Sequence, residues 1–433
     1  MKLRNLGILG AAGLLAVTAA VPAFAQSPAA KGTLGLGIEL PLSGGEVANG
    51  VPTKNGVLLA IQQQNAKGGV QGYQLVDVTK DDAVNGAHDP NQGASNVTSL
   101  VADPSVFGVV GPFNSSVARA EIPVSNAAGL AQCSPANTGV DLTKAGSEAY
   151  RPEKPDARNY FRVATSDDFQ GPAGSAIAYT TLGKTKAFVV DDTEAFGKGV
   201  ADSFSTKFQE LGGTIVDRQG NDYKVNQDFK SMLTAQQGNF DVVYFGGTQV
   251  TGGGDLRKAM GQLGMLDIPL VGPDGITDLQ PGGSEGAFIT LAGVENSGNV
   301  YGTVAGIHDI PNPDAFATAY TAAFGDPPGA YSALAYACAQ LLIRALDTAI
   351  AGGADPTNID ALREATRAAV FDGSSVDTVL GTLSIDPNGD TTQKWISVYA
   401  TDTTLNDGKG GWKYLSQVNM AEPAGSPASS TAP

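Results

Sequence analysis

Residues 106–116 read VFGVVGPFNSS, and this stretch decides the predicted fold. Its first five residues are apolar or small and predict a short buried strand, which a Gly-Pro pair then ends. Ser115 can cap a helix that follows toward Ala128, and residues 129–134 again resemble a strand. Strand, turn and helix in this order form the repeating unit of a parallel sheet that is covered by helices.

The same unit recurs along most of the chain in two runs. The first run includes predicted strands at 34–40 and 75–79, and the second includes strands at 187–191 and 242–245. The break between the runs falls after residues 159–162. The pattern therefore predicts an α/β protein with two parallel sheets, each covered by helices on both faces.

The last part of the chain follows a different pattern. Helices are predicted at 315–324, 331–350 and 359–369, followed by strands at 382–385 and 395–399 that the turn DPNGD joins. Helices that come after both sheets must pack on one of them. Two lobes joined by more than one chain crossing would explain this, and the cleft between the lobes is the natural ligand site.

Composition excludes several classes of function. The chain has 433 residues and a formal net charge of −16, so it has no general attraction to nucleic acid or to an anionic membrane. With only two His and two Cys, a zinc cluster is excluded, and neither a metal nor a cofactor is expected. Cys133 and Cys338 fit two separately buried thiols better than a bridge, although an exported protein would permit one.

Both ends of the chain are expected to lie outside the folded part. Residues 1–25 have a basic start, an apolar run and an A-x-A end, which is typical of a cleaved secretory signal peptide; the alternative is a membrane anchor. No Cys stands at the cleavage point, so no lipoprotein anchor is expected. Residues 26–33 are predicted to be a linker and 416–433 a disordered tail. The mature protein is therefore expected to be soluble and exported, periplasmic or at the cell surface, and without a later membrane span.

Three polar motifs follow predicted strands. Ser115 follows the VFGVV strand, and the segment 134–138 (SPANT) follows the next one. Because ligands bind beyond the carboxyl ends of strands in such sheets, their hydroxyl groups could hold one carboxylate. Asp274, in a G-P-D-G turn of the second run, could accept an ammonium group. Taken singly, Ser115 also fits a plain helix cap and Asp274 a plain turn residue.

Catalysis has weak support in the sequence. Ser115 could be combined with His308 and an Asp as a hydrolase triad, but the chain lacks the G-x-S-x-G motif of that class. An exported α/β hydrolase that uses Ser115 is nevertheless the alternative function. A ligand-binding module of a sensor is a third possibility.

Short motifs in a specific order give the chain a family resemblance. They include PLSG at 41–44, NAKGGVQG at 65–72, KDD at 80–82, QGP at 170–172 and GPDG at 272–275. With these motifs the chain resembles the periplasmic substrate-binding proteins of branched-chain amino acid ABC transporters. The resemblance implies a type I periplasmic binding fold with three crossings. It places residues 34–165 and 303–396 in lobe I, and residues 166–302 and 397–415 in lobe II.

The resemblance also implies a set of ligand contacts. Ser115, Ala136 and Thr138 would hold the ligand carboxylate, and Asp274 would hold the ammonium group. Asp167 corresponds to a second family acid near the first crossing. The remaining expected pocket residues are Phe113, Asn114, Phe196, Thr248 and Tyr331. Thr248 replaces a family aromatic residue, and Asn114 replaces one Cys of the family's usual pair, so the side-chain pocket matches less well than the carboxylate site.

The implied function is transport rather than catalysis. The protein would bind a branched-chain or other neutral amino acid between its lobes and deliver it, as a monomer, to the membrane permease of an ABC importer. The expected mechanism is hinge closure around the ligand without a chemical step.

Overall fold

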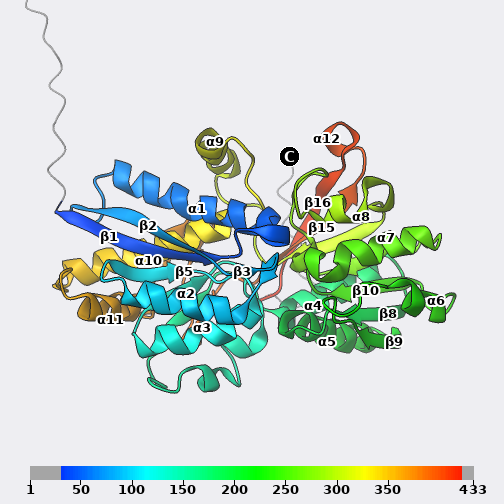
Figure 1. The fold of residues 1–433 in the computed structure, drawn as a ribbon, viewed down its shortest axis with the longest axis horizontal. Helices are drawn as coiled ribbons and strands as arrows, with labels where there is room; N and C mark the ends of the chain where they lie inside the picture. Colours follow the sequence, from blue (N-terminus) through cyan, green and yellow to red (C-terminus); the bar gives the residue numbers. More distant parts are fainter. Residues whose placement is uncertain (1–30, 422–433) are drawn as a thin grey trace, which may run out of the picture.

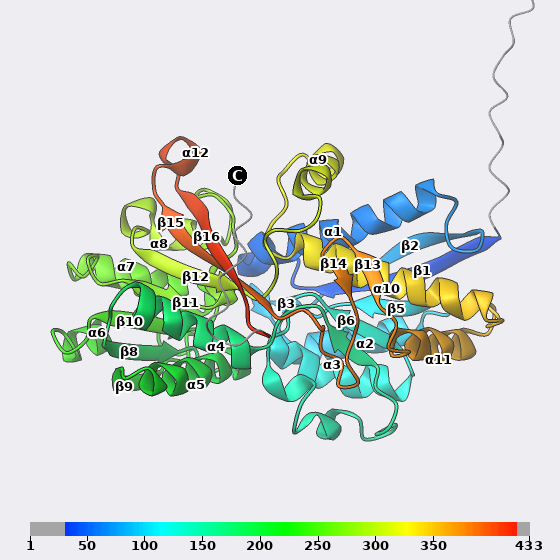
Figure 2. The same ribbon diagram turned by 180° about the vertical axis from the view of Figure 1, so that it is seen from behind.

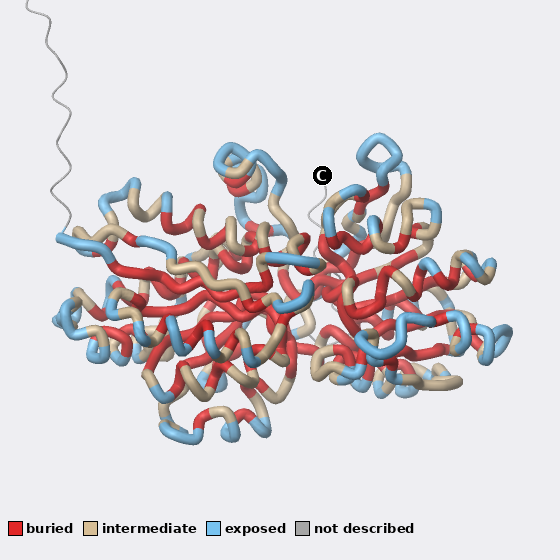
Figure 3. Tube along the Cα trace, in the orientation of Figure 1, coloured by how far each residue is buried: buried red, intermediate tan, exposed pale blue. Residues whose placement is uncertain are grey.

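The computed structural model describes residues 31–421 and consists of two α/β lobes that lie side by side (Figure 1). Each lobe is built around a central sheet, and buried residues concentrate in the two sheets and on the inner sides of the helices (Figure 3). The predicted signal peptide and the last residues of the predicted tail lie outside the described residues.

The first sheet is entirely parallel, as predicted. Its strand order is β2 (Tyr73–Asp81), β1 (Gly32–Leu40), β5 (Val106–Val110), β6 (Ala131–Ser134) and β7 (Tyr160–Arg162). All five residues of β5 are buried because helices cover both faces of this sheet. Phe107 faces the core that includes the late helices, while Val106 and Val109 face the opposite cluster with Leu100.

Helices from distant parts of the chain cover this sheet. They are α1 (Val47–Ala66), α2 (Pro90–Ala102), α3 (Ser115–Ala127), α9 (Pro313–Phe324), α10 (Ser332–Ala351) and α11 (Ile359–Val370). The Asp89 side chain caps α2 by accepting hydrogen bonds from two backbone N–H groups. Helices α1 and α10 touch so closely that a Cβ at Gly56 would lie 2.1 Å from the carbonyl oxygen of Ser332. The late helices therefore belong to the first lobe.

Helix α10 is long and apolar enough to cross a membrane by length and composition, and among the described residues it is the only such helix. No later segment of this kind was expected from the sequence. Most of α10 is buried in the core of the first lobe, where Cys338, Leu342 and Leu346 contact the sheet cluster. Its apolar character is thus explained by packing inside the protein.

The strands of the second predicted run pair in parallel, as expected, and an antiparallel hairpin that was not predicted makes the second sheet mixed. Its order is β16 (Gly411–Asn419), β15 (Trp395–Asp402), β12 (Val300–Val304), β11 (Leu270–Gly272), β10 (Val242–Gly246), β8 (Lys186–Asp191) and β9 (Thr214–Gly220). Its first five strands in sequence, β8 to β12, pair in parallel. The β15–β16 hairpin then pairs with β12 in the antiparallel direction. Figure 2 shows this hairpin beside β12. The helices of this lobe are α4 (Asp167–Ser175), α5 (Ala195–Glu210), α6 (Lys230–Ala235), α7 (Gly254–Gln262) and α8 (Phe288–Ala292).

Two further predictions about the end of the chain need correction. The strand predicted at 382–385 is β14 (Gly381–Leu383), and it pairs with β13 (Val376–Thr378) instead of joining the 395–399 strand. The predicted turn is present, with Gly389 N–H donating to the carbonyl of Asp386 at 2.9 Å. Residues 416–419 are part of β16, so the tail cannot begin at 416.

Cys133 and Cys338 form a disulfide, which contradicts the expectation of two separate thiols. Cys133 lies on β6 and Cys338 on α10, 205 residues later. Helix α10 packs directly on the first sheet, which brings the two Cα atoms to 5.6 Å. Sequence spacing contains no information about such a contact.

The chain passes three times between the sheets, and the three passages are hydrogen bonded to one another. Thr165, after β7, donates its backbone N–H to the carbonyl of Ala305, after β12, at 2.9 Å. Its hydroxyl donates to the carbonyl of Trp395, at the start of β15, at 2.8 Å. These three segments therefore lie together where the chain passes between the lobes.

Candidate functional site

Two neighbouring strand ends of the first lobe carry the predicted carboxylate anchors. Ser115 is the first residue of α3, the helix that follows β5 after the loop 111–114, and Thr138 follows β6. The two loops are tied together, because the Gly139 N–H donates to Ser115 Oγ at 3.2 Å and Asn137 Nδ2 donates to the carbonyl of Phe113 at 2.7 Å. The prediction that these motifs meet at one edge of the sheet is confirmed.

Asp274 lies across the cleft, at the end of β11 in the second lobe. It is buried, and its Oδ1 accepts a hydrogen bond from Gln170 Nε2 at 3.1 Å. Its Oδ2 accepts a hydrogen bond from the hydroxyl of Tyr331, which immediately precedes α10 of the first lobe. This acid therefore links the two lobes.

One small cavity lies between these groups. It is lined by Phe113, Asn114, Ser115, Ala136, Thr138, Phe196, Thr248, Asp274, Gly275 and Tyr331. Nine of these ten residues were predicted from the sequence to contact the ligand. The cavity has a volume of only about 20 Å³, which is little more than one water molecule requires. The lobes are thus closed tightly on each other at this point.

Asp167, the tenth predicted contact, does not line the cavity. Its carboxylate accepts a hydrogen bond from Gln170 Nε2 at 3.0 Å, and its backbone N–H donates to the carbonyl of Thr138 at 2.9 Å. Burial, and then the nearby charge of Asp274, raise the pKa of Asp167 to about 7. Asp167 therefore affects the site electrostatically and through Gln170.

Asp274 is poised to accept a cation. Burial raises its pKa to about 6, and the hydrogen bonds from Tyr331 and Gln170 limit that rise. The residues that line the cavity include no Lys or Arg. The carboxylate is therefore largely ionised near pH 7, and a ligand ammonium group would compensate a buried negative charge.

Aromatic rings form one wall of the cavity. Phe113 and Tyr331 pack edge to face with ring centroids 4.9 Å apart, and the half-buried Phe196 comes from α5 of the opposite lobe. Thr248 contributes little polarity, because its hydroxyl already accepts the backbone N–H of Thr251 at 3.2 Å. The backbone N–H of Ala136 likewise donates to Ser134 Oγ at 3.2 Å. The wall is suited to an apolar side chain.

Gln170 was not predicted as a site residue, although it belongs to the QGP motif at 170–172. Its side chain bridges Asp167 and Asp274, and its Oε1 accepts hydrogen bonds from Thr303 Oγ1 at 2.9 Å and from the Asp274 N–H at 3.0 Å. Its position in α4, at the first passage between the lobes, makes these contacts possible. No pattern in the sequence pairs it with residues 104 and 133 positions away.

A second polar contact between the lobes lies outside the cavity. The ring of His88 contacts Glu46 of the first lobe through Nδ1 at 2.5 Å and Glu194 of the second lobe through Nε2 at 2.8 Å. Burial opposes protonation of this ring, but the two carboxylates raise the pKa of His88 well above its ordinary value. A protonated imidazole between two carboxylates therefore joins the lobes.

The geometry does not support the hydrolase alternative. His88 contacts Glu46 and Glu194, while Nδ1 of His308 contacts the hydroxyl of Tyr399 at 2.8 Å. Within residues 31–421, neither imidazole is hydrogen bonded to Ser115. In the same range no group of three or more His, Cys, Asp or Glu side chains has the arrangement of a metal site.

Comparisons with known proteins agree with the fold and the resemblance. The family model described as periplasmic binding protein matches residues 33–407. The Leu/Ile/Val-binding protein BraC3 of Rhizobium johnstonii is 31% identical over 385 residues, covering 88% of this chain and 94% of that protein. The leucine-, isoleucine-, valine-, threonine- and alanine-binding protein of Pseudomonas aeruginosa is 29% identical, covering 88% and 93%.

A solved structure extends the similarity to three dimensions. It is the branched-chain amino acid transporter substrate-binding protein LivJ of Streptococcus pneumoniae in complex with isoleucine. It superposes with a TM-score of 0.71 at 27% identity, covering 88% of this chain and 99% of that one. The match spans both lobes and nearly the whole described chain. This protein therefore belongs to the periplasmic binding protein family.

Proposed function

We propose that this protein captures a neutral amino acid with an apolar side chain, of the leucine, isoleucine or valine type, between its lobes. The observation that supports this most directly is that Ser115, Thr138 and Asp274 line one cavity. Hydroxyl donors from one lobe stand opposite a carboxylate from the other. This is the polarity that a zwitterion requires, with its carboxylate toward Ser115 and Thr138 and its ammonium toward Asp274.

The side chain of the ligand would pack against Phe113, Phe196 and Tyr331. Burial of a side chain of this size contributes about 1.5–3 kcal/mol, and each charge-assisted hydrogen bond contributes about 1.5–3 kcal/mol. These gains are offset by the cost of ordering the ligand and the closed lobes. The polar groups thus distinguish amino acids from other solutes, and the apolar wall distinguishes one amino acid side chain from another.

Ligand entry requires the lobes to separate. A cavity of about 20 Å³ is far too small for an amino acid. The three passages near Thr165, Ala305 and Trp395 are the natural hinge, because few residues need to change conformation there. We propose lobe boundaries at these passages, with residues 34–165 and 303–396 in one lobe, and residues 166–302 together with 397–419, up to the end of β16, in the other.

Delivery follows from the same motion. The closed, ligand-bound protein would dock on the permease of an ABC importer and open there, so no bond is made or broken in the ligand. We further propose that the protein acts as a periplasmic monomer after removal of residues 1–25. Relatives named as Leu/Ile/Val-binding proteins support the ligand class, and similarity to a branched-chain amino acid transporter substrate-binding protein supports the transport role.

The test is a binding screen on the purified mature protein. Thermal-shift measurements with all neutral amino acids, followed by calorimetry, identify the ligand because binding to the folded state raises the melting temperature. Leucine is then compared with leucinamide, which lacks the carboxylate, and with 4-methylpentanoate, which lacks the ammonium group. Both analogues should bind at least tenfold more weakly. A protein that binds 4-methylpentanoate as tightly as any amino acid would refute the proposal.

A further inference from the structure

We propose that the buried pair Arg162–Asp390, outside the cavity, positions the two loops that carry Ser115 and Thr138 and thereby sets the selectivity for a ligand carboxylate. This inference rests on the proposed function and adds positioning residues to it. Neither Arg162 nor Asp390 lines the cavity.

Arg162 is completely buried at the end of β7, and its guanidinium contacts three different segments. Nε donates to Asp390 Oδ1 at 2.7 Å, and the second terminal nitrogen donates to Thr143 Oγ1 at 2.7 Å. The first terminal nitrogen donates to the carbonyl oxygens of Gly139 at 2.7 Å and Asn137 at 3.3 Å. The guanidinium of Arg162 therefore holds the loop at both Asn137 and Gly139, the two residues that flank position 138.

The residue that they flank is Thr138, which lines the cavity. The loop that Arg162 holds is also hydrogen bonded to Ser115, the other predicted carboxylate anchor, because the Gly139 N–H donates to Ser115 Oγ at 3.2 Å. Asn137 continues the connection by donating to the carbonyl of Phe113 at 2.7 Å. The orientations of both hydroxyl anchors thus depend on the loop that Arg162 holds.

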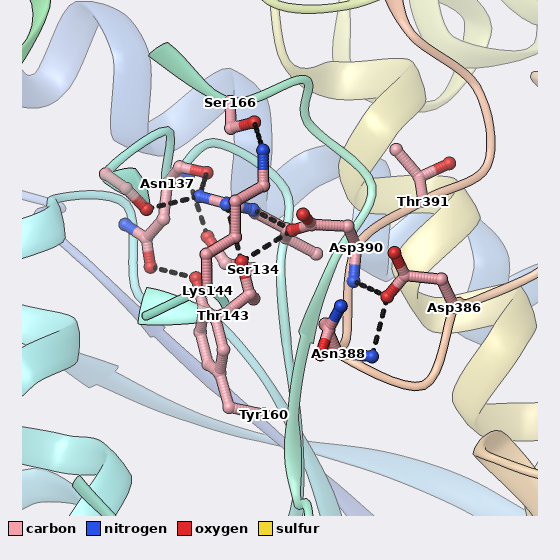
Figure 4. Close-up of polar contacts among 12 residues, drawn as sticks. Ser134, Asn137, Thr143, Lys144, Tyr160, Ser166, Asp386, Asn388, Asp390 and Thr391 are labelled. Carbon is pink, nitrogen blue, oxygen red and sulfur yellow. Dashed lines mark hydrogen bonds and ion pairs between the residues drawn. The ribbon is translucent and has the colours of Figure 1, made fainter. Parts of the chain in front are cut away.

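Neighbouring side chains complete the support. The Tyr160 hydroxyl donates to Asn137 Oδ1 at 2.8 Å, and the Thr143 hydroxyl donates to Asp390 Oδ1 at 2.8 Å, as Figure 4 shows. The turn at 386–390 is itself fixed, because the Asp390 N–H donates to Asp386 Oδ1 at 3.0 Å. Asp390 precedes the third passage between the lobes by a few residues, so the same network ties the site to the hinge.

The role of this pair is geometric rather than electrostatic. Burial opposes ionisation of Asp390, but Arg162 and Thr143 lower the pKa of that carboxyl below its ordinary value. The pair is therefore ionised and neutral overall, and it offers little net charge to a ligand. Only a planar fork can reach Asp390, Thr143 and two carbonyl oxygens together, which a lysine cannot do.

The experiment measures selectivity and stability separately. Arg162→Lys keeps the charge but loses the fork, and Thr143→Val is a milder change in the same network. For each variant, calorimetry gives the dissociation constants of leucine and leucinamide, and thermal melting reports the fold. Arg257→Lys is the matched control, because Arg257 is equally buried and also donates to several carbonyl oxygens, but in the second lobe away from the cavity.

The expected result is a loss of affinity for leucine that is larger than the loss of affinity for leucinamide. Arg162→Lys should weaken leucine binding at least tenfold and leucinamide binding less than threefold, with a smaller shift in the same direction for Thr143→Val. Arg257→Lys should lower the melting temperature and leave the ratio of the two constants unchanged. The proposal is overturned if both site variants keep the wild-type ratio or weaken both ligands equally. Leucine binding by the wild-type protein tests the proposed function itself. Failure of the proposed function is therefore distinguishable from failure of the positioning role of Arg162 and Asp390.

Discussion

The substitution Asp274→Asn removes one charge from the candidate site with almost no change of shape. Asp274 is buried at the boundary between the lobes, and its two carboxylate oxygens accept hydrogen bonds from Gln170 and Tyr331. An amide can keep one of these contacts. The variant therefore isolates the contribution of the negative charge that we assign to the ligand ammonium group.

Two opposite effects are expected. A charge-assisted hydrogen bond contributes about 1.5–3 kcal/mol, so the dissociation constant of the amino acid should rise about 10- to 100-fold. The unliganded protein should instead become more stable. Burial raises the pKa of Asp274 from 3.8 to about 6, which means that its ionised form disfavours folding at pH 7 by an amount on the order of 3 kcal/mol. Loss of affinity with a gain in melting temperature is a distinctive signature.

Calorimetry at pH 7.5 measures the affinity, and thermal melting without ligand measures the stability. Asp278→Asn is the matched control, because Asp278 lies four residues away, is fully buried and has a pKa that burial raises to about 6. Its carboxylate accepts the N–H of Phe288 and does not line the cavity. An Asp274→Asn protein that binds the ligand as tightly as wild type would refute the assignment of Asp274.

Three further predictions concern pH, redox state and closure. Because ligand binding requires ionised Asp274, affinity should fall about tenfold between pH 7 and pH 5, and calorimetry should find a much smaller decrease in Asp274→Asn. Reduction of the Cys133–Cys338 disulfide should lower the free energy of unfolding by about 2–5 kcal/mol, and an unchanged denaturant midpoint would contradict this. His88→Gln removes the charged contact with Glu194, so small-angle scattering should show a more open unliganded protein and calorimetry a weaker affinity; identical scattering curves would argue against this role.

Local patterns in the sequence were sufficient for most of the architecture. Strand, turn and helix signals predicted the parallel first sheet and the late helices, because these features depend on residues close together in the chain. Ser115 and Thr138 could be paired in advance since both follow strands that are neighbours in such a fold. The motifs shared with a known family extended the prediction to nine residues that line the cavity.

Contacts between distant segments could be found only in the tertiary structure. The sequence contains nothing that pairs Cys133 with Cys338, adds the β15–β16 hairpin antiparallel to β12, or directs Gln170 to Asp274. The same is true of Arg162, whose partner Asp390 is 228 residues away. Local patterns report the conformation and burial that each short segment prefers. Which buried polar groups meet is determined by how whole lobes pack, because each group must find a partner inside the protein once water is excluded.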